Sequence, residues 1–435
     1  VRMADSVKKE DATQPHVNVG EGITAHRTDG SRVSPHNLEG GNKPSHKNKG
    51  SRSVEEYTNM HQIGEGQYGQ VWLARGQDEN GQGIYAALKK VKMDNEKEGF
   101  PITAIREIKI LKNLHHPNIV ALREIVVSKN TDHNKQKGSV YMVFEYAETD
   151  LAGLMMSSKV ELGKAHIKHF MKQLLIGLHY LHKQKILHRD IKGANLLITK
   201  DGMLKIADFG LARSYNDPSV PLTKKVITLW YRPPEVLLES EYGAPADIWS
   251  VGCIFAELLA KLKHNTLRPI WALPEVQGPR DENEQIKKIW HICGTPTKET
   301  WPNFHELPGM RSVDISKNVK PNILKEHIVK NMETATIKMS EMELDLIQQM
   351  LTCNPDKRID ANAALDHQYF WEEPMAAAPK DLVKNGIGLH EWQVKKEKQA
   401  EKHKQGPAMA HHGRGPAMPP GPGGAPPAKM QRTGH

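Results

Sequence analysis

Short apolar runs bounded by turn residues dominate the first part of the chain, and apolar residues at helical spacing dominate the second part. In the first part, β-forming residues between Gly-, Asn- and Asp-containing turns predict strands at residues 71–75, 84–91, 119–127 and 139–146. In the second part, Lys164–His182 carries Ile, Leu, Phe and Met at intervals of three and four, which predicts a buried helix. The change near residue 147 predicts two lobes, and a crevice between lobes is a natural ligand site.

One helix is predicted within the strand-rich part. Residues 101–111 read P-I-T-A-I-R-E-I-K-I-L and place Ile105, Ile108 and Leu111 on one face. Thr103 is expected to cap the N-terminus of this helix, because its hydroxyl can accept a hydrogen bond from a free backbone N–H.

Both ends of the chain lack apolar periodicity. Residues 1–53 are rich in Gly, Ser, His, Asn and Lys and are expected to form a disordered polar tail. Residues 371–404 are a charged extension that includes a predicted helix at 391–404, and residues 405–435 are Gly- and Pro-rich and expected to be disordered. The chain starts with Val rather than Met, so we expect a fragment rather than the true N-terminus.

A group of polar residues follows the predicted buried helix. The stretch His188–Asn195, H-R-D-I-K-G-A-N, leads into a hairpin whose second strand ends at Asp208 in D-F-G. The hairpin is expected to bring Asp190, Lys192 and Asn195 close to Asp208. Metal-assisted phosphoryl transfer needs such groups, because a carboxylate orients the attacking hydroxyl and oxygen ligands hold Mg²⁺.

A glycine-rich segment in the strand-rich part points to phosphate binding. Gly64–Gly69, G-E-G-Q-Y-G, is followed by strand-forming residues, which favours a strand–turn–strand flap over a dinucleotide-binding turn. Glycines in such a flap let backbone N–H groups approach phosphates. Lys89 on the next strand is a candidate phosphate contact, with Glu107 as its partner; taken singly, each would be an ordinary surface charge.

Composition narrows the class of protein. The 435 residues suffice for a large core, and the net charge of +9 is compatible with acidic partners without indicating nucleic-acid binding. Cys253, Cys293 and Cys353 lack C-x-x-C spacing, which argues against a disulfide framework or a zinc site. No apolar run is long enough to span a bilayer, so no membrane association is expected.

These segments, taken in this order over residues 57–370, resemble a protein kinase, with P-P-E at 233–235 as a further match. Pro101–Glu107, P-I-T-A-I-R-E, resembles the cyclin-contacting helix of the cyclin-dependent kinases. The chain is similar to their transcription-elongation branch, which includes the plant C-type members that phosphorylate the RNA polymerase II C-terminal domain. The resemblance implies an α+β, bilobal protein-kinase fold. It has a small β-rich N-lobe (57–146) with one regulatory helix and a larger, mainly α-helical C-lobe (147–370), flanked by disordered tails.

The resemblance implies roles for individual residues. Lys89, held by Glu107, would grip the ATP phosphates, and Asp190 would orient the substrate hydroxyl. Lys192 would touch the γ-phosphate and fits serine or threonine specificity, while Asn195 and Asp208 would hold Mg²⁺. The remaining expected ATP contacts lie in the flap, the hinge and the adenine pocket: Ile63, Gly64, Glu65, Gly66, Gln67, Tyr68, Gly69, Val71, Ala87, the gatekeeper Phe144, Glu145, Ala147, the ribose contact Asp150, and Leu197.

Regulation by phosphorylation is implied as well. Thr223 matches the activation-loop phosphosite, and Arg106, Arg189 and Arg213 match the arginine pocket that would receive its phosphate. Tyr68 is retained as a candidate inhibitory phosphosite.

Further features come from the resemblance. Arg232 and the loop before it resemble the site that prefers proline after the phosphorylated residue. Glu235 with Arg358, and Asp247 with the catalytic-loop backbone, are expected to be structural. The insert at 261–280 departs from the family pattern, and the C-terminal extension around His390 and Glu391 resembles one that can return to the nucleotide cleft.

The favoured hypothesis is a nuclear, cyclin-dependent serine/threonine kinase that uses ATP and Mg²⁺ on Ser/Thr-Pro sites of the polymerase C-terminal domain to promote elongation. A transcriptional cyclin and an activating kinase for Thr223 are its expected partners, without sequence-specific nucleic-acid binding. A cell-cycle-type cyclin-dependent kinase is the alternative within the family, and the cytoplasm is the alternative location. A kinase-fold scaffold or an RNA- or chromatin-binding protein without catalysis is the alternative of another class.

Overall fold

The computed structural model of the chain describes residues 51–66, 69–78, 80–93, 100–129, 138–215, 223, 226–273, 278–313, 319–379 and 390–404. Of the predicted disordered tail at 1–53, residues 1–50 lie outside this part and residues 51–53 are described. Residues 405–435, Gln67, Tyr68 and residues 380–389 also lie outside it. All described residues belong to one compact unit that begins at Ser51.

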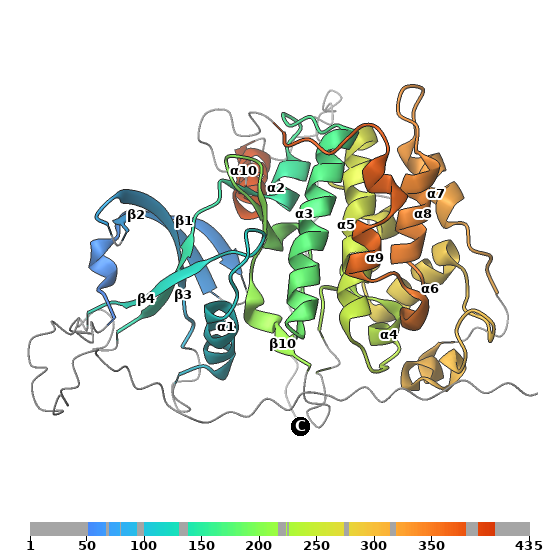
Figure 1. Cartoon of the computed structure of the whole chain (residues 1–435), viewed down its shortest axis with the longest axis horizontal. Coiled ribbons are helices and arrows are strands. Elements are labelled where there is room, and N and C mark those ends of the chain that lie inside the picture. The colour runs from blue at the N-terminus through green and yellow to red at the C-terminus, as the bar shows by residue number, and fades with distance from the viewer. Residues whose placement is uncertain are drawn as a thin grey trace, which may run out of the picture. The chain divides into compact units, whose positions relative to one another are not determined.

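The N-terminal lobe is a five-stranded antiparallel sheet with the order β1-β2-β3-β5-β4 (Figure 1). Lys89 on β3 pairs with Val71 on β2 and Met142 on β5, so it lies in the middle of the sheet. Gly69 has φ +135°, and a Cβ there would lie 2.3 Å from the backbone oxygen of Lys90, so only glycine fits this turn. The strands are β1 (Thr58–Gly66), β2 (Gly69–Gln77), β3 (Gly83–Lys90), β4 (Leu122–Val127) and β5 (Val140–Glu145).

Helix α1 (Ile102–Lys112) is present where it was predicted, but its start and its buried face differ. Pro101 occupies the N-cap position and Thr103 lies inside the helix, so the predicted Thr103 cap was wrong. Proline's φ of −58° is already suited to a helix start. The buried face contains Glu107, while Ile105 is 38% exposed. The helix therefore buries a carboxylate and leaves an isoleucine at the surface.

The C-terminal lobe is built around α3 (Lys164–Lys183) and α5 (Ala244–His264), which pack against each other. Residues 246–261 of α5 are all buried, because the other helices surround it. Trp249 of α5 stacks on Trp271 with ring centroids 5.7 Å apart. The other helices are α2 (Leu151–Met156), α4 (Pro234–Leu237), α6 (Glu282–Cys293), α7 (Leu324–Met332), α8 (Glu341–Met350) and α9 (Ala361–Leu365).

Short strands beside the N-lobe carry the polar loops. β6 (Thr149–Asp150), β8 (Leu196–Ile198) and β9 (Leu204–Ile206) form one sheet, and β7 (Ile186–Leu187) pairs with β10 (Arg213–Ser214). The β8–β9 hairpin is the one predicted from the sequence, and it brings the loop after β7 next to the segment after β9.

The predicted insert at 261–280 begins as the last turn of α5. It continues into a buried 3-10 turn, Ile270–Ala272, that packs on α5 and α6, while residues 274–277 lie outside the described part.

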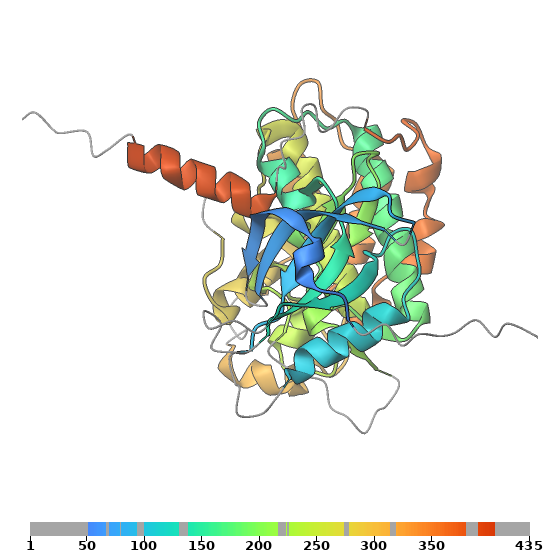
Figure 2. The same ribbon diagram turned by 90° about the vertical axis from the view of Figure 1, so that its left-hand side faces the viewer.

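A C-terminal helix, α10 (Glu391–Lys404), covers the residues for which a charged helix was predicted. It contacts α2 and β1, and Figure 2 shows its far end projecting away from both lobes. The chain therefore crosses back from the C-lobe to the strand-rich lobe.

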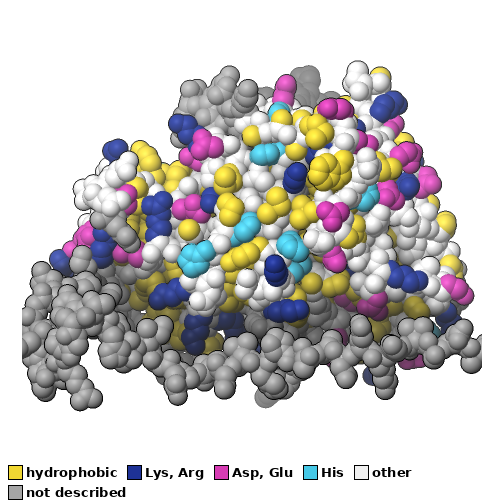
Figure 3. All heavy atoms as spheres, in the orientation of Figure 1, with side chains coloured by type: hydrophobic (Ala, Val, Ile, Leu, Met, Phe, Trp, Pro, Cys, Tyr) yellow, Lys and Arg dark blue, Asp and Glu magenta, His cyan; other side chains and the backbone are white. Residues whose placement is uncertain are grey.

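The surface over the helical lobe carries mixed charges. Figure 3 shows acidic and basic side chains interspersed with hydrophobic ones on this face. Among the described residues, no helix is long and apolar enough to cross a membrane.

Candidate active site

The loop after β7 is held in place by hydrogen bonds to Asp247 of α5. The Asp247 carboxylate accepts hydrogen bonds from the backbone N–H of His188 (3.0 Å) and of Arg189 (2.9 Å), and lies 3.1 Å from His182 Nε2. Burial raises the pKa of Asp247, but the bonds from His182 and the loop outweigh burial and lower it. Arg189 has φ +65°, a strained conformation that these bonds stabilise. The structural role expected for Asp247 is confirmed.

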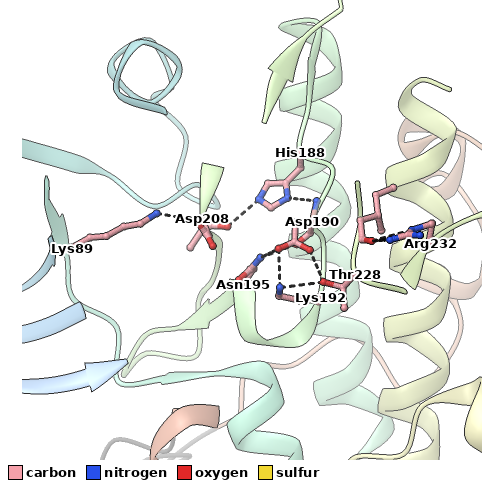
Figure 4. Close-up of polar contacts among 10 residues, drawn as sticks. Lys89, His188, Asp190, Lys192, Asn195, Asp208, Thr228 and Arg232 are labelled. Carbon is pink, nitrogen blue, oxygen red and sulfur yellow. Dashed lines mark hydrogen bonds and ion pairs between the residues drawn. The ribbon is translucent and has the colours of Figure 1, made fainter. Parts of the chain in front are cut away.

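Asp190 is at the centre of the polar cluster (Figure 4). Lys192 Nζ lies 2.8 Å from its Oδ2, and the Asn195 amide donates to the same oxygen at 3.0 Å. The Thr228 hydroxyl donates to Asp190 Oδ1 at 2.8 Å and accepts from Lys192 at 3.2 Å. The loop residues that the sequence pointed to are therefore together, and Thr228, which sequence reasoning missed, joins them from a segment 38 residues away.

Asp208 is held at the opposite side of the cluster. It has φ +61°, and the His188 ring beside it bonds Ala207 O at 2.9 Å and meets Phe209 edge-on at 5.1 Å. Phe209 is buried, so this packing fixes the direction of the Asp208 carboxylate.

Lys89 bridges two carboxylates. Its Nζ lies 2.8 Å from Glu107 Oε1 and 2.9 Å from Asp208 Oδ1. Burial lowers the pKa of Lys89, but Asp208 and Glu107 raise it above its usual value, so the lysine stays charged. Burial raises the pKa of Glu107, which Lys89 partly offsets, whereas Lys89 outweighs burial at Asp208 and lowers its pKa. The predicted Lys89–Glu107 pair is thus formed and reaches Asp208.

A cavity of about 580 Å³ lies between the lobes, beside this cluster. Both Asp190 and Lys192 line it from the C-lobe side. Most of the expected ATP contacts line it too: Ile63, Gly64, Glu65, Gly69, Val71, Ala87, Lys89, Phe144, Glu145, Ala147, Asp150 and Leu197. Gly66 is the last residue of β1.

Asn195 and Asp208 offer oxygen donors suited to Mg²⁺. Both hydrogens of the Asn195 amide are used by Asp190, through its backbone oxygen at 2.8 Å and its carboxylate at 3.0 Å, so the amide oxygen is the group left to face a ligand. Lys89 binds Oδ1 of Asp208, so the second carboxylate oxygen, Oδ2, is the one that could bind a metal ion. Amide and carboxylate oxygens are what Mg²⁺ binds.

Asp150, the expected ribose contact, is partly engaged by the chain itself. Its Oδ1 accepts from Gly153 N at 2.7 Å and caps α2. Its Oδ2 accepts from Glu391 N at 2.8 Å and lies 3.4 Å from His390 Nδ1. His390, Glu391 and Trp392 line the cavity, so the C-terminal extension returns to the cleft.

The residues expected around Thr223 also converge. Burial lowers the pKa of Arg106, and the nearby Arg213 and Arg189 lower it further, which shows that the three cations share one region. Tyr242, missed by sequence reasoning, donates to the Thr223 backbone oxygen at 2.8 Å and lies 3.0 Å from Arg189 Nη1. Thr223 is exposed beside this cluster.

The expected structural pair is confirmed deeper in the C-lobe. Arg358 forms a two-point contact with the Glu235 carboxylate at 2.7 and 2.8 Å, and both side chains are fully buried.

Comparisons with known proteins agree with this site. The family described as "Protein kinase domain" matches residues 57–370. Cyclin-dependent kinase C-1 of Oryza sativa subsp. japonica is 47% identical over 361 residues, covering 80% of this chain and 65% of the relative. Cyclin-dependent kinase 9 of Homo sapiens is 44% identical over 334 residues, covering 76% of this chain and 83% of the relative.

A solved structure of a kinase complex is also similar to this chain. The crystal structure of the yeast RNA Pol II CTD kinase CTDK-1 complex contains a chain that is 40% identical, with a TM-score of 0.64, covering 76% of this chain and 97% of that one. The present chain spans only about 65% of the length of the plant relatives. The matched domain and these likenesses show that the chain belongs to the protein kinase family, among the cyclin-dependent kinases.

Proposed function

We propose that this chain is a cyclin-dependent serine/threonine kinase that transfers the ATP γ-phosphoryl group to Ser/Thr-Pro sites of the RNA polymerase II C-terminal domain. The observation that carries the proposal is the cluster around Asp190. A carboxylate, an ammonium and a hydroxyl meet there within 3.2 Å, beside a cavity whose far side holds the Lys89–Glu107 pair. Phosphoryl transfer depends mainly on such positioning and charge stabilisation.

Each group in the cluster has a part in the transfer. Asp190 accepts the hydrogen bond of the substrate hydroxyl and orients it toward the γ-phosphorus. It takes up the hydroxyl proton as the new P–O bond forms and the bond from the γ-phosphorus to the bridging oxygen breaks, which releases ADP. Lys192, close to Asp190 and Thr228, offsets negative charge on the transferred group. Lys89 contacts the α- and β-phosphates, and Glu107 holds its ammonium in place.

Asn195 and Asp208 would hold the Mg²⁺ that accompanies ATP, and the ion would neutralise charge on the phosphate oxygens. Around the base, Ile63, Val71, Ala87 and Leu197 would enclose the adenine, with the hinge at Glu145 and Ala147 as backbone contacts. Asp150 would meet the ribose beside the returning C-terminal extension.

Proline selection is supported by the loop before α4. Arg232 Nε and Nη2 donate to the Ile227 backbone oxygen at 3.1 and 2.9 Å, so this acceptor is already satisfied. A substrate N–H placed against it would stay unpaired, whereas proline has no N–H to satisfy.

The surface of α1 supports a cyclin partner. Ile102 is 70% and Ile105 is 38% exposed on the helix that carries Glu107. Exposed apolar side chains on a helix suit a protein interface, and a cyclin seated there would control the position of Glu107. A phosphate on Thr223, added by an activating kinase, would bind Arg106, Arg189 and Arg213 and join α1 to the catalytic loop.

The likeness to a chain of the solved complex described as a yeast RNA Pol II CTD kinase supports the proposed substrate. A nucleus-located protein would meet that substrate, so the nucleus is the proposed location. The same likeness favours a role in transcription elongation over the cell-cycle alternative. The relatives and the intact Asp190 cluster also argue against a scaffold without catalysis.

The proposal is tested by affinity purification of the full chain, identification of the bound cyclin, and assay of the complex on a heptad-repeat polymerase peptide. We expect a transcriptional cyclin and phosphate on serine followed by proline. A mitotic-type cyclin, or full activity of the isolated unphosphorylated chain, would contradict the proposal.

A further inference from the structure

Arg232 uses two edges of its guanidinium for two different partners. The edge formed by Nε and Nη2 binds the Ile227 oxygen, and Nη1 lies 2.6 Å from Glu282 Oε1 of α6. The Arg232 side chain is 14% exposed and that of Glu282 is 54% exposed. Figure 4 shows Arg232 reaching the loop beside Thr228. The contact of Arg232 with this loop therefore borders the site of transfer.

Ile227 needs this support because of its backbone conformation. Its φ is +66°, which is unfavourable for a β-branched residue, and its side chain is buried. The strained turn directs the Ile227 carbonyl at Arg232, next to Thr228 and the cavity. The orientation of Arg232 therefore decides whether this carbonyl is satisfied from within the chain or is open to a peptide N–H.

Glu282 is placed for this contact by the start of α6. Asp281 is the N-cap and accepts from Glu284 N at 2.8 Å, while Glu284 accepts from Arg280 N at 2.9 Å. The two bonds fix the first turn of the helix. Glu282, the first residue of α6, thus extends from a rigid support rather than from a loose loop.

We infer that Glu282 is a positioning residue for proline selectivity: it holds Arg232 so that the guanidinium keeps the Ile227 carbonyl occupied. The inference rests on the proposed function, and it assigns to α6 a part in choosing the residue that follows the phosphorylated serine or threonine. Without Glu282, Nη1 of Arg232 has no ion-pair partner on α6, and the Arg232 side chain samples other orientations. The Ile227 carbonyl is then open for part of the time, and it can accept a hydrogen bond from the backbone N–H of a substrate residue other than proline.

Salt provides a second signature. An ion pair that is half exposed weakens as ionic strength rises, since the Debye length is about 10 Å at 0.1 M and about 3 Å at 1 M. The proline preference of the unaltered kinase should therefore fall with added salt, and the preference of a variant that lacks the Glu282 charge should not.

The test uses the full chain with its bound cyclin and two peptides that differ only in proline or alanine after the target serine. The measured quantity is the ratio of kcat/KM for the two peptides, at low and high salt. Glu282→Ala should lower this ratio by about two- to fivefold, the range a half-exposed ion pair spans, mainly by improving the alanine peptide. Glu282→Gln, which keeps an oxygen acceptor, should give an intermediate ratio.

Glu55→Ala is the matched control. Glu55 forms a 2.6 Å ion pair with Lys129 in the N-lobe, and its side chain is 53% exposed. The Glu55→Ala variant therefore loses a comparable ion pair far from Arg232. Its ratio should equal that of the unaltered kinase at every salt concentration.

The outcomes separate this inference from the proposed function. If the unaltered kinase prefers proline and Glu282→Ala keeps the same ratio and salt dependence, the inference is wrong and the proposed function stands. A change limited to peptides with basic residues would likewise contradict it, because Glu282 would then contact the substrate directly. If the unaltered kinase shows no preference for proline, both are wrong.

Discussion

Thr228 offers a sharp test of how Asp190 is oriented. Thr228→Val keeps the shape of the side chain but removes a hydroxyl that donates to Asp190 Oδ1 at 2.8 Å and accepts from Lys192 at 3.2 Å. A hydrogen bond to a charged group is worth about 1.5–3 kcal/mol. If this bond matters fully in the transition state, kcat should fall by a factor of roughly 10 to 150.

The Michaelis constant for ATP should change little, because the expected adenine contacts lie elsewhere in the cavity. The assay is steady-state kinetics of the cyclin-bound chain on a serine-proline peptide, with Thr228→Ser as the control that restores the hydroxyl. Thr228 is exposed, so the variant should melt within a few degrees of the unaltered protein. A Thr228→Val kinase within threefold of the unaltered rate would show that the Thr228 hydroxyl does not orient Asp190 for transfer.

The remaining predictions concern the activation segment and the core. Tyr242→Phe should leave basal activity unchanged and reduce the gain from phosphate on Thr223 by about two- to tenfold. The variant loses the hydroxyl that accepts from Arg189 and donates to the Thr223 backbone oxygen, and a hydrogen bond is worth about 0.5–1.5 kcal/mol. An unchanged ratio of phosphorylated to unphosphorylated activity would count against it. Glu235→Ala should destabilise the fold by about 3–5 kcal/mol in urea unfolding, since it leaves Arg358 buried without its partner; a loss below about 1 kcal/mol would disagree. Burial raises the pKa of Glu257 to about 8, although the Tyr231 hydroxyl bonded to both of its oxygens lowers it in part. The folded chain therefore holds a proton that the unfolded chain releases, so stability should fall as pH rises from about 4.5 to about 8. Glu257→Gln should flatten this decline in melting temperature, and an identical slope would contradict the assignment.

Motif spacing was enough to predict the groups that are close along the chain or belong to one hairpin. Asp190, Lys192 and Asn195 share one loop, and the β8–β9 hairpin fixes their distance from Asp208. The Lys89–Glu107 pair was predicted through the family resemblance, because periodicity cannot show that a strand and a helix 18 residues apart will meet.

Residues that act from distant segments were missed. Thr228 and Tyr242 carry no motif of their own, and their hydroxyls matter only because the fold brings them to Asp190 and Thr223. The strained φ of Ile227 could not be predicted from the sequence, because a β-branched residue ordinarily predicts an extended backbone. The predicted Thr103 cap was wrong because two residues favour a helix start in this segment, threonine as a cap and proline before the first turn. The helix begins directly after Pro101.

Phosphate transfer to serine or threonine followed by proline should depend on Asp190. The most direct measurement is phosphate incorporation into a heptad-repeat polymerase peptide by the cyclin-bound chain, comparing the unaltered protein with Asp190→Asn. We expect robust transfer to serines followed by proline and its loss in Asp190→Asn, with ATP binding and melting temperature retained. Equal transfer by the two proteins would contradict this role of Asp190.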